Sequence, residues 1–196
     1  MRCGFDVIDT PMQGLKLIQR KPIGDHRGYL ERMFCAEELR SLMPGKGIVQ
    51  INHTLTAKRG TVRGLHYQWP PSQEGKLVRC IRGRLYDVLL DLRPRSPSYL
   101  QHVGVTLDED NRAAVFIPPG IAHGFQTQLP RTEVLYQMTD KYAPALAAGV
   151  RWNDPAFSIR WPMPEIVISE RDAGYPDFDA RQFERELERR TTAGPA

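Results

Sequence analysis

The sequence predicts a mostly β protein that folds as one domain, as either a sandwich or a barrel. Between residues 47 and 140, short apolar segments alternate with turn-forming residues, which is typical of antiparallel β proteins. The chain has 196 residues, 41% of them hydrophobic, which suffices for one sizeable core. Segments with helical periodicity are few. We therefore expect one domain over residues 1–190 and a disordered tail at 191–196.

The predicted strands are short and bounded by turn residues. They are GIVQINHTLT (47–56), KLVRCIRG (76–83), RLYDVLLDLR (84–93), YLQHVGVTL (99–107), AAVFIPPG (113–120), HGFQTQL (123–129) and TEVLYQMT (132–139). In RLYDVLLDLR, alternation puts Val88 and Leu90 on one face and Asp87 and Asp91 on the other. We expect one packed face and one face that carries carboxylates. Gly83 is expected to turn the chain between two paired strands.

Two segments have helical character, and both are expected at the periphery of the domain. AEELRSLMPG (36–45) ends at Pro44 and Gly45, which terminate helices. DARQFERELERR (179–190) has a narrow apolar stripe formed by Phe183 and Leu187. Such a stripe buries only one side of the helix.

Composition argues against several classes of function. The formal net charge is +4, but acidic residues are interleaved with basic ones, so nucleic acid is not an expected partner. No apolar run reaches the roughly 18 residues that span a bilayer, and the N-terminus lacks the apolar centre of a signal peptide. We expect no membrane partner and a cytoplasmic location. Cys3, Cys35 and Cys80 lack CxxC spacing, which favours reduced thiols.

The segments GLHYQ (64–68) and PPGIAHGF (118–125) resemble the two histidine motifs of cupin barrels. A metal-binding cupin places two histidines one residue apart in the first motif, but here His66 is followed by Gln68. His66, Glu74 and His123 could still form a two-histidine, one-carboxylate site. Lys76 opposes it, because its ammonium would compete with a divalent cation. Without further matches, His66 is equally interpreted as a hydrogen-bonded core histidine, and Lys76 as a surface lysine.

Longer motifs extend the resemblance. They are GDHRGYLERMF (24–34), VQINHT (49–54), GTVRGLHYQ (60–68), GKLVRC (75–80), YDVLLDLRPRSPSY (86–99), IPPGIAHGFQT (117–127), EVLYQMTDKYAP (133–144), WNDPAFSIRWP (152–162) and SERD (169–172). In this order they resemble the dTDP-4-dehydrorhamnose 3,5-epimerases through most of residues 15–175. The resemblance implies a cupin-type jelly-roll barrel with short peripheral helices, an isomerase without cofactor or metal, a nucleotide-sugar substrate, and a homodimer that shares strands across its interface.

The resemblance also assigns roles in epimerisation next to a ketone, which removes a proton from one face of the sugar and returns one to the other. The family's base falls on His66, and the aspartate that orients it falls on Asp172. The opposite-face acid matches Tyr136. Lys76 would stabilise the enolate, because a preorganised cation is effective where charge develops. Residues matching substrate-binding positions are Arg27, Glu31, Gln50, Asn52, Arg63, His123, Tyr142 and Arg171.

Three departures from the family pattern are expected near the nucleotide end. RGYLE is one residue shorter than the usual RGxxxE, Glu74 stands where glutamine is common, and Arg171 stands where lysine is common. Two alternatives therefore stay open. One is a C3- or C5-monoepimerase of a related dTDP- or CDP-sugar, and the other is a non-catalytic cupin that binds a sugar nucleotide.

Overall fold

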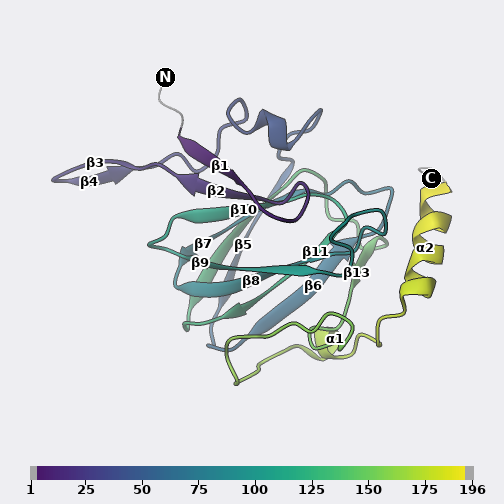
Figure 1. Ribbon diagram of the computed structural model, residues 1–196. Helices are drawn as coiled ribbons and strands as arrows, with labels where there is room; N and C mark the ends of the chain where they lie inside the picture. Colours follow the sequence, from purple (N-terminus) through teal and green to yellow (C-terminus); the bar gives the residue numbers. More distant parts are fainter. Residues whose placement is uncertain (1–3, 193–196) are drawn as a thin grey trace.

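Two large antiparallel sheets face each other in the computed structural model, which describes residues 4–192 (Figure 1). The six-stranded sheet has the order β1-β2-β10-β7-β12-β5, and the five-stranded sheet has the order β13-β6-β11-β8-β9. The predicted mostly β jelly roll is confirmed. The strands are β1 Phe5–Asp9, β2 Lys16–Arg20, β3 Ile23–Asp25, β4 Gly28–Leu30, β5 Gln50–Thr56, β6 Val62–Gln68, β7 Lys76–Arg82, β8 Arg84–Asp91, β9 His102–Asp108, β10 Ala113–Ile117, β11 Ile121–Thr127, β12 Thr132–Met138 and β13 Ala147–Gly149.

The barrel interior is filled at one end and open at the other. Buried side chains from both sheets, among them Val78, Leu89 and Phe125, form the central apolar cluster. The same strands carry polar residues beyond this cluster, at positions such as Lys76 and His66. Alternation along each strand thus places a packed layer beneath a polar one.

Both sheets are covered on their outer faces. The segment around Leu39 and Met43 packs on the six-stranded sheet. The outer face of the five-stranded sheet is covered by helix α2 (Ala180–Thr192) and the loops before it, where Phe183 contacts Trp69. Figure 1 shows α2 running along this side of the barrel, while the β3–β4 hairpin extends away from the opposite side.

Strand β8 corrects one prediction, because both of its faces are buried. Asp87 and Asp91 have no exposed surface and share the inner face with Leu85 and Leu89 of the central cluster. Alternation was predicted correctly, but the rule that carboxylates face solvent fails here. Asp87 pairs with His123, and Asp91 is bonded by Arg93, Ser96 and Ser98, which replace water.

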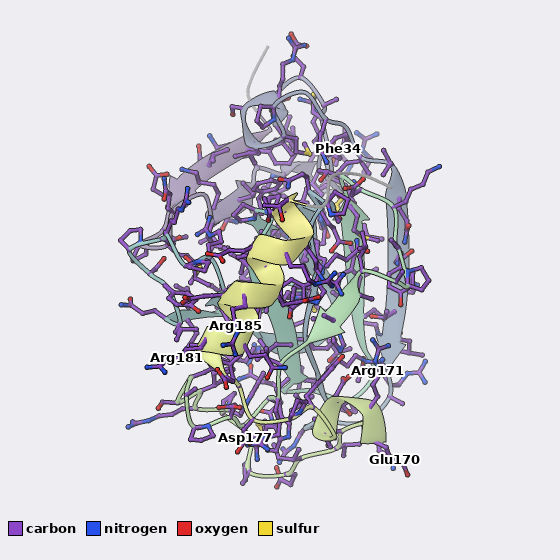
Figure 2. The ribbon with its side chains drawn as sticks, turned by 90° about the vertical axis from the view of Figure 1, so that its right-hand side faces the viewer. Phe34, Glu170, Arg171, Asp177, Arg181 and Arg185 are labelled. Carbon is purple, nitrogen blue, oxygen red and sulfur yellow. The ribbon has the colours of Figure 1, made fainter. Side chains whose placement is uncertain are left out.

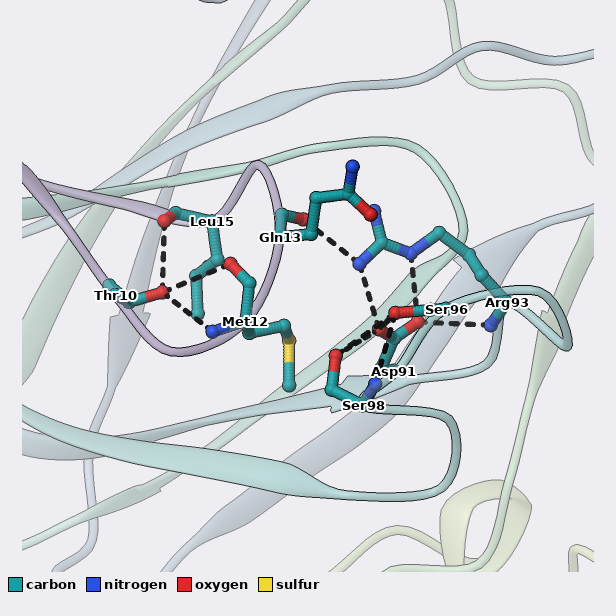
Figure 3. A network of polar contacts seen from close by, with 8 residues as sticks. All are labelled: Thr10, Met12, Gln13, Leu15, Asp91, Arg93, Ser96 and Ser98. Carbon is teal, nitrogen blue, oxygen red and sulfur yellow. Dashed lines mark hydrogen bonds and ion pairs between the residues drawn. The ribbon is translucent and has the colours of Figure 1, made fainter.

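Asp91 organises the loop that follows β8 (Figure 3). Its carboxylate accepts hydrogen bonds from the Arg93 backbone N at 3.0 Å and from its Nε at 2.8 Å, and from the hydroxyls of Ser96 and Ser98 at 2.5 and 2.6 Å. Burial raises the pKa of Asp91, but these hydrogen bonds outweigh burial and lower it to about 2. The carboxylate is therefore ionised at neutral pH and fixes the loop to the barrel.

One of the two predicted helices is wrong. Residues 36–45 form only a short 3₁₀ helix, Arg40–Leu42, in which Met43 N donates to Arg40 O. The segment is short, ends at Pro44, and buries Leu39 and Met43, so tertiary packing rather than helical repetition sets its shape.

The C-terminal helix is confirmed and α2 continues to Thr192, two residues into the tail expected to be disordered. The remaining tail residues, 193–196, lie outside the described range. Gly83 does turn the chain, with φ of 79°, but it joins β7 of one sheet to β8 of the other rather than two paired strands. Cys35 and Cys80 are free thiols, as expected, and Cys3 is outside the described residues.

Candidate active site

The open end of the barrel holds a cavity of about 310 Å³ between the two sheets. All predicted site residues except Arg27 and Glu31 line it. They are His66, Asp172, Tyr136, Lys76, Gln50, Asn52, Arg63, His123, Tyr142 and Arg171. Residues separated by up to 122 positions in the chain therefore meet at one place, as expected from the sequence.

The wall formed by the six-stranded sheet carries Tyr136 and Lys76. In the register, Tyr136 pairs with Asn52 of β5, and Met138 pairs with both Gln50 and Lys76. Because paired residues point to the same face of a sheet, these side chains form two adjacent rows on the inner surface. Burial raises the pKa of Tyr136. Its phenol therefore keeps its proton at neutral pH.

The opposite wall carries His66 and Arg63, which are three residues apart and would point to opposite faces of a regular strand. On β11 the partners of these two residues are His123 and Phe125, only two residues apart. β6 thus contains one extra residue, a β-bulge, and both side chains face the cavity. Gly64 permits it. Its φ is 121°, and an added Cβ would lie 2.5 Å from Gly124 Cα, so no larger residue fits.

The His66 imidazole forms a pair with Asp172. Its Nε2 lies 2.8 Å from Asp172 Oδ1, and the Gly64 backbone N donates to Asp172 Oδ2 at 3.1 Å. Asp172 belongs to the short helix α1 (Glu170–Ala173), whose N-cap Ser169 accepts a hydrogen bond from Asp172 N. Burial raises the pKa of Asp172, but the bonds from His66 and Gly64 outweigh it and the pKa is lowered. An ionised carboxylate thus holds one ring nitrogen and leaves the other free to accept a proton.

A second histidine–aspartate pair lies deeper in the barrel. His123 Nε2 is 2.6 Å from Asp87 Oδ1, and both side chains are buried. The His123 ring lies edge-on to Tyr136, with centroids 6.0 Å apart. Asp87 was missed as a site residue, although an aspartate in the middle of an apolar strand was a usable signal. The pair supports the wall that carries Tyr136.

Lys76 pairs with Glu74, whose carboxylate oxygen lies 3.0 Å from the Lys76 Nζ. Both side chains are largely buried and both line the cavity. Glu74 was expected near the nucleotide end, and which end of the cavity it serves stays a prediction. The carboxylate sits beside the cation expected at the reacting carbonyl, so the cation is held in place by a charge partner.

The residues considered for a metal site have separate partners. His66 binds Asp172, His123 binds Asp87, and Glu74 binds Lys76. No group of three or more possible metal ligands occurs within residues 4–192. Gln68 has another function, because its side-chain oxygen accepts a hydrogen bond from Ala143 N at 2.8 Å and so anchors the loop that follows β12.

That loop carries Tyr142, whose backbone N donates to the side-chain oxygen of Gln50 at 3.0 Å. The Tyr142 side chain is exposed at the mouth of the cavity. Arg171 reaches the same region from α1, which Figure 2 shows to the lower right of α2 with Glu170 and Arg171 labelled. A tyrosine and an arginine therefore border the entrance.

Arg27 and Glu31 are not brought into this cavity. Arg27 lies on the extended hairpin and pairs with Asp25, with a shortest contact of 2.6 Å. Glu31 is buried against Arg20 on the outer side of the six-stranded sheet, at 2.5 Å. Within one chain these two residues do not line the cavity, because β3–β4 extends away from the barrel (Figure 1). Their role in substrate binding stays a prediction.

The sequence profile of the dTDP-4-dehydrorhamnose 3,5-epimerases matches residues 9–180. The chain belongs to this family. A dTDP-4-dehydrorhamnose 3,5-epimerase of Sinorhizobium fredii is 43% identical over 165 residues, which cover 84% of this chain and 85% of the relative.

Solved structures of epimerases are also similar to the chain. The chain is similar to a dTDP-6-deoxy-D-glucose-3,5-epimerase of Legionella pneumophila in complex with dTDP-4-keto-L-rhamnose, with a TM-score of 0.86, 34% identity, and coverage of 93% of this chain and 96% of that chain. It is also similar to a dTDP-4-dehydrorhamnose 3,5-epimerase of Bacillus anthracis with TDP and PPi bound, with a TM-score of 0.85, 36% identity, and coverage of 89% and 99%. Neither helix within residues 4–192 has the length and apolar composition to cross a membrane.

Proposed function

We propose that the protein epimerises C3 and C5 of dTDP-4-dehydro-6-deoxyglucose, yielding dTDP-4-dehydrorhamnose, without a cofactor. The observation that carries the proposal is the placement of His66–Asp172 and Tyr136 on facing walls of one cavity. Inversion at a carbon requires proton removal on one face and proton delivery on the other. A base and an acid on facing sheets supply this geometry.

In the proposed reaction, the free ring nitrogen of His66 accepts the proton from the carbon next to the ketone. Asp172 holds the other nitrogen and stabilises the imidazolium that forms. The electrons of the broken C–H bond move into the carbonyl, which becomes an enolate. The Lys76 ammonium stabilises that oxygen, and Glu74 holds the ammonium in place.

Tyr136 then donates its proton to the opposite face of the enolate carbon. Burial keeps the phenol neutral, so it is available as a donor. The phenolate that results is close to the His123–Asp87 pair and to Arg63, which lines the same cavity. A proton returned from solvent restores the phenol, and the same groups repeat the exchange at the second carbon.

The nucleotide diphosphate is proposed to bind at the mouth of the cavity. Arg171 and Arg63 supply guanidinium groups for phosphate oxygens, and Tyr142 supplies an aromatic surface. Gln50 and Asn52 line the same cavity from β5. A nucleotide-sugar substrate also fits the cytoplasmic location expected from the sequence.

The active form is proposed to be a homodimer. The hairpin β3–β4 exposes Ile23, Tyr29 and Leu30, and edge strand β5 exposes Ile51 and Leu55 on its outer face. Apolar side chains in this amount at two sheet edges favour burial against a second copy. In such a dimer, the hairpin could carry Arg27 to the cavity of the partner. Sedimentation analysis should give twice the mass of the chain, and a monomer that is fully active would contradict this arrangement.

The reaction is tested by incubating the protein with dTDP-4-dehydro-6-deoxyglucose in deuterated water and following the sugar by NMR. Deuterium should enter at C3 and C5, and the rhamno epimer should form. The His66→Ala variant should show neither deuterium exchange nor epimer. Pretreatment with a chelator should leave the rate unchanged. Binding of the nucleotide sugar without any exchange would favour the non-catalytic alternative, and exchange at only one carbon would favour a monoepimerase.

A further inference from the structure

Tyr175 lies next to the proposed base but does not belong to the catalytic set. Its ring meets the His66 imidazole edge-on, with centroids 6.4 Å apart and planes at 67°. The lining of the cavity, as far as residues 4–192 form it, does not include Tyr175. The ring therefore supports the imidazole from the protein side rather than from the substrate side.

Gly149 makes this position possible. It pairs with His66 in the register of β13 and β6. A Cβ added to Gly149 would lie 2.4 Å from Tyr175 Cζ and 2.6 Å from its hydroxyl oxygen. The tyrosine ring thus occupies the space that a side chain at position 149 would fill, directly beside the strand that carries the base.

The segment that carries Tyr175 is anchored on both sides. Before it, Gly174 N donates to Glu170 O and closes α1. After it, Phe178 N donates to Asp154 Oδ2 at 2.7 Å, and Asp177 pairs with Arg151. These contacts fix the backbone on either side of the tyrosine, so the position of its ring is determined by the fold.

A single hydrogen bond to Asp172 fixes one atom of the imidazole but not the plane of the ring. The His66 side chain is 41% exposed, so much of the ring faces the open cavity rather than protein. Proton transfer from carbon depends on the direction of the free ring nitrogen, and small errors in such a direction lower the rate steeply. A second contact is therefore required to orient the base.

We propose that Tyr175, seated over Gly149, is a positioning residue that fixes the plane of the His66 imidazole; this rests on the proposed function, in which His66 is the base. The ring acts on His66 by occupying space, and this role does not need its hydroxyl, which interacts with Arg171. Any change that removes the ring or displaces it should lower turnover.

The test is a double-mutant cycle with Tyr175→Ala and Gly149→Ala. Each single change should lower kcat of epimerisation by about 10- to 100-fold, because each removes or displaces the same ring. KM of Tyr175→Ala should lie within about threefold of KM of Tyr175→Phe, because both variants lack the hydroxyl that interacts with Arg171. The double variant should be no slower than Tyr175→Ala, since the added methyl then meets no ring.

Two controls belong to the experiment. Tyr175→Phe keeps the ring and should retain near-normal kcat. Gly47→Ala adds the same methyl group where nothing lies within 4 Å, and should behave as the unmodified protein. Unfolding midpoints are measured for all variants, and kcat is compared at a temperature at which each is folded.

A spectroscopic readout separates this inference from the proposed function. The imidazole N–H proton in the His66–Asp172 bond should give a sharp NMR signal in the unmodified protein and a broadened one in Tyr175→Ala, with no substrate present. Normal kcat and a sharp signal in Tyr175→Ala would overturn the positioning role. Losses that multiply in the double variant would also overturn it. An unmodified protein without activity would refute the proposed function, and the NMR signal would then decide the positioning role alone.

Discussion

Replacing Asp172 with asparagine tests the proposed base without changing the shape of the site. The two carboxylate oxygens have different donors, His66 Nε2 at 2.8 Å and the Gly64 backbone N at 3.1 Å. A backbone N–H can only donate. The amide oxygen of the asparagine must therefore face Gly64, and its NH₂ group must face His66.

This orientation forces the wrong imidazole tautomer. His66 Nε2 would have to accept a hydrogen bond, and the ring proton would move to the nitrogen that must take the substrate proton. Loss of a charge-assisted hydrogen bond costs about 1.5–3 kcal/mol, or about 10- to 100-fold in rate. Because the tautomer is also wrong, we expect kcat to fall by about 10²–10⁴-fold.

The assay measures deuterium exchange and epimer formation in the same NMR time course. Both should fall together in Asp172→Asn, because both require the enolate, and the ¹⁵N shifts of His66 should report the changed tautomer. Glu170→Gln, an exposed change on the same helix, is the matched control and should leave both rates unchanged. An Asp172→Asn protein within about threefold of the unmodified rate would refute the role assigned to this pair.

Three further predictions concern the acid, the cation and the fold. In Tyr136→Phe, His66 can still return deuterium to the original face of the sugar. NMR should therefore show deuterium exchange within about tenfold of normal, while epimer formation falls by about 10²-fold or more. Equal loss of both would mean that Tyr136 helps to form the enolate. Lys76→Met should lower exchange and epimerisation alike by about 10²–10³-fold, and Glu74→Gln, which keeps the cation, by clearly less; a larger loss in Glu74→Gln would reverse these roles. The pKa of Asp91 is about 2 in the folded protein and 3.8 ordinarily, so its ionised form stabilises the fold above pH 4. About 2 kcal/mol of the free energy of unfolding is therefore lost as the pH falls to 2. Urea unfolding of Asp91→Asn should show lower stability at pH 6 and a shallower dependence between pH 4 and 2; an unchanged pH dependence would contradict the assignment.

The strands from β5 to β12 could be predicted from the sequence because each is a short apolar segment between turn residues. The N-terminal strands and β13 could not. Neighbouring residues in β1 and β2 include many charges, such as Asp6, Asp9 and Lys16, which form pairs on the sheet surface. The helix predicted at residues 36–45 is wrong for a different reason. The local sequence favours a helix, but the packing of Leu39 and Met43 does not require one.

Burial of charged groups was the main feature that could not be predicted from the sequence. Asp87 pairs with His123 across 36 positions, and Glu74 pairs with Lys76 only because both turn into the cavity. Alternation shows that a residue shares a face with its neighbours but not that the face is internal. The resemblance located His66, Asp172 and Tyr136, whereas Tyr175 carries no signal, because its contact with His66 exists only in the folded chain.

The structure contains two histidine–aspartate pairs, and their surroundings favour only one as the base. His123 and His66 are paired residues of neighbouring strands, and the Nε2 of each lies at hydrogen-bonding distance from a carboxylate oxygen. The residue types and distances in the two pairs do not show which histidine is the base. The His123 side chain is 6% exposed and that of His66 is 41% exposed. A base must touch the carbon-bound proton of a substrate in the cavity, and only the exposed ring can do so. The buried pair instead contacts Tyr136 on the facing wall, so we propose that burial makes one copy of this chemical motif the reacting group and the other a supporting one.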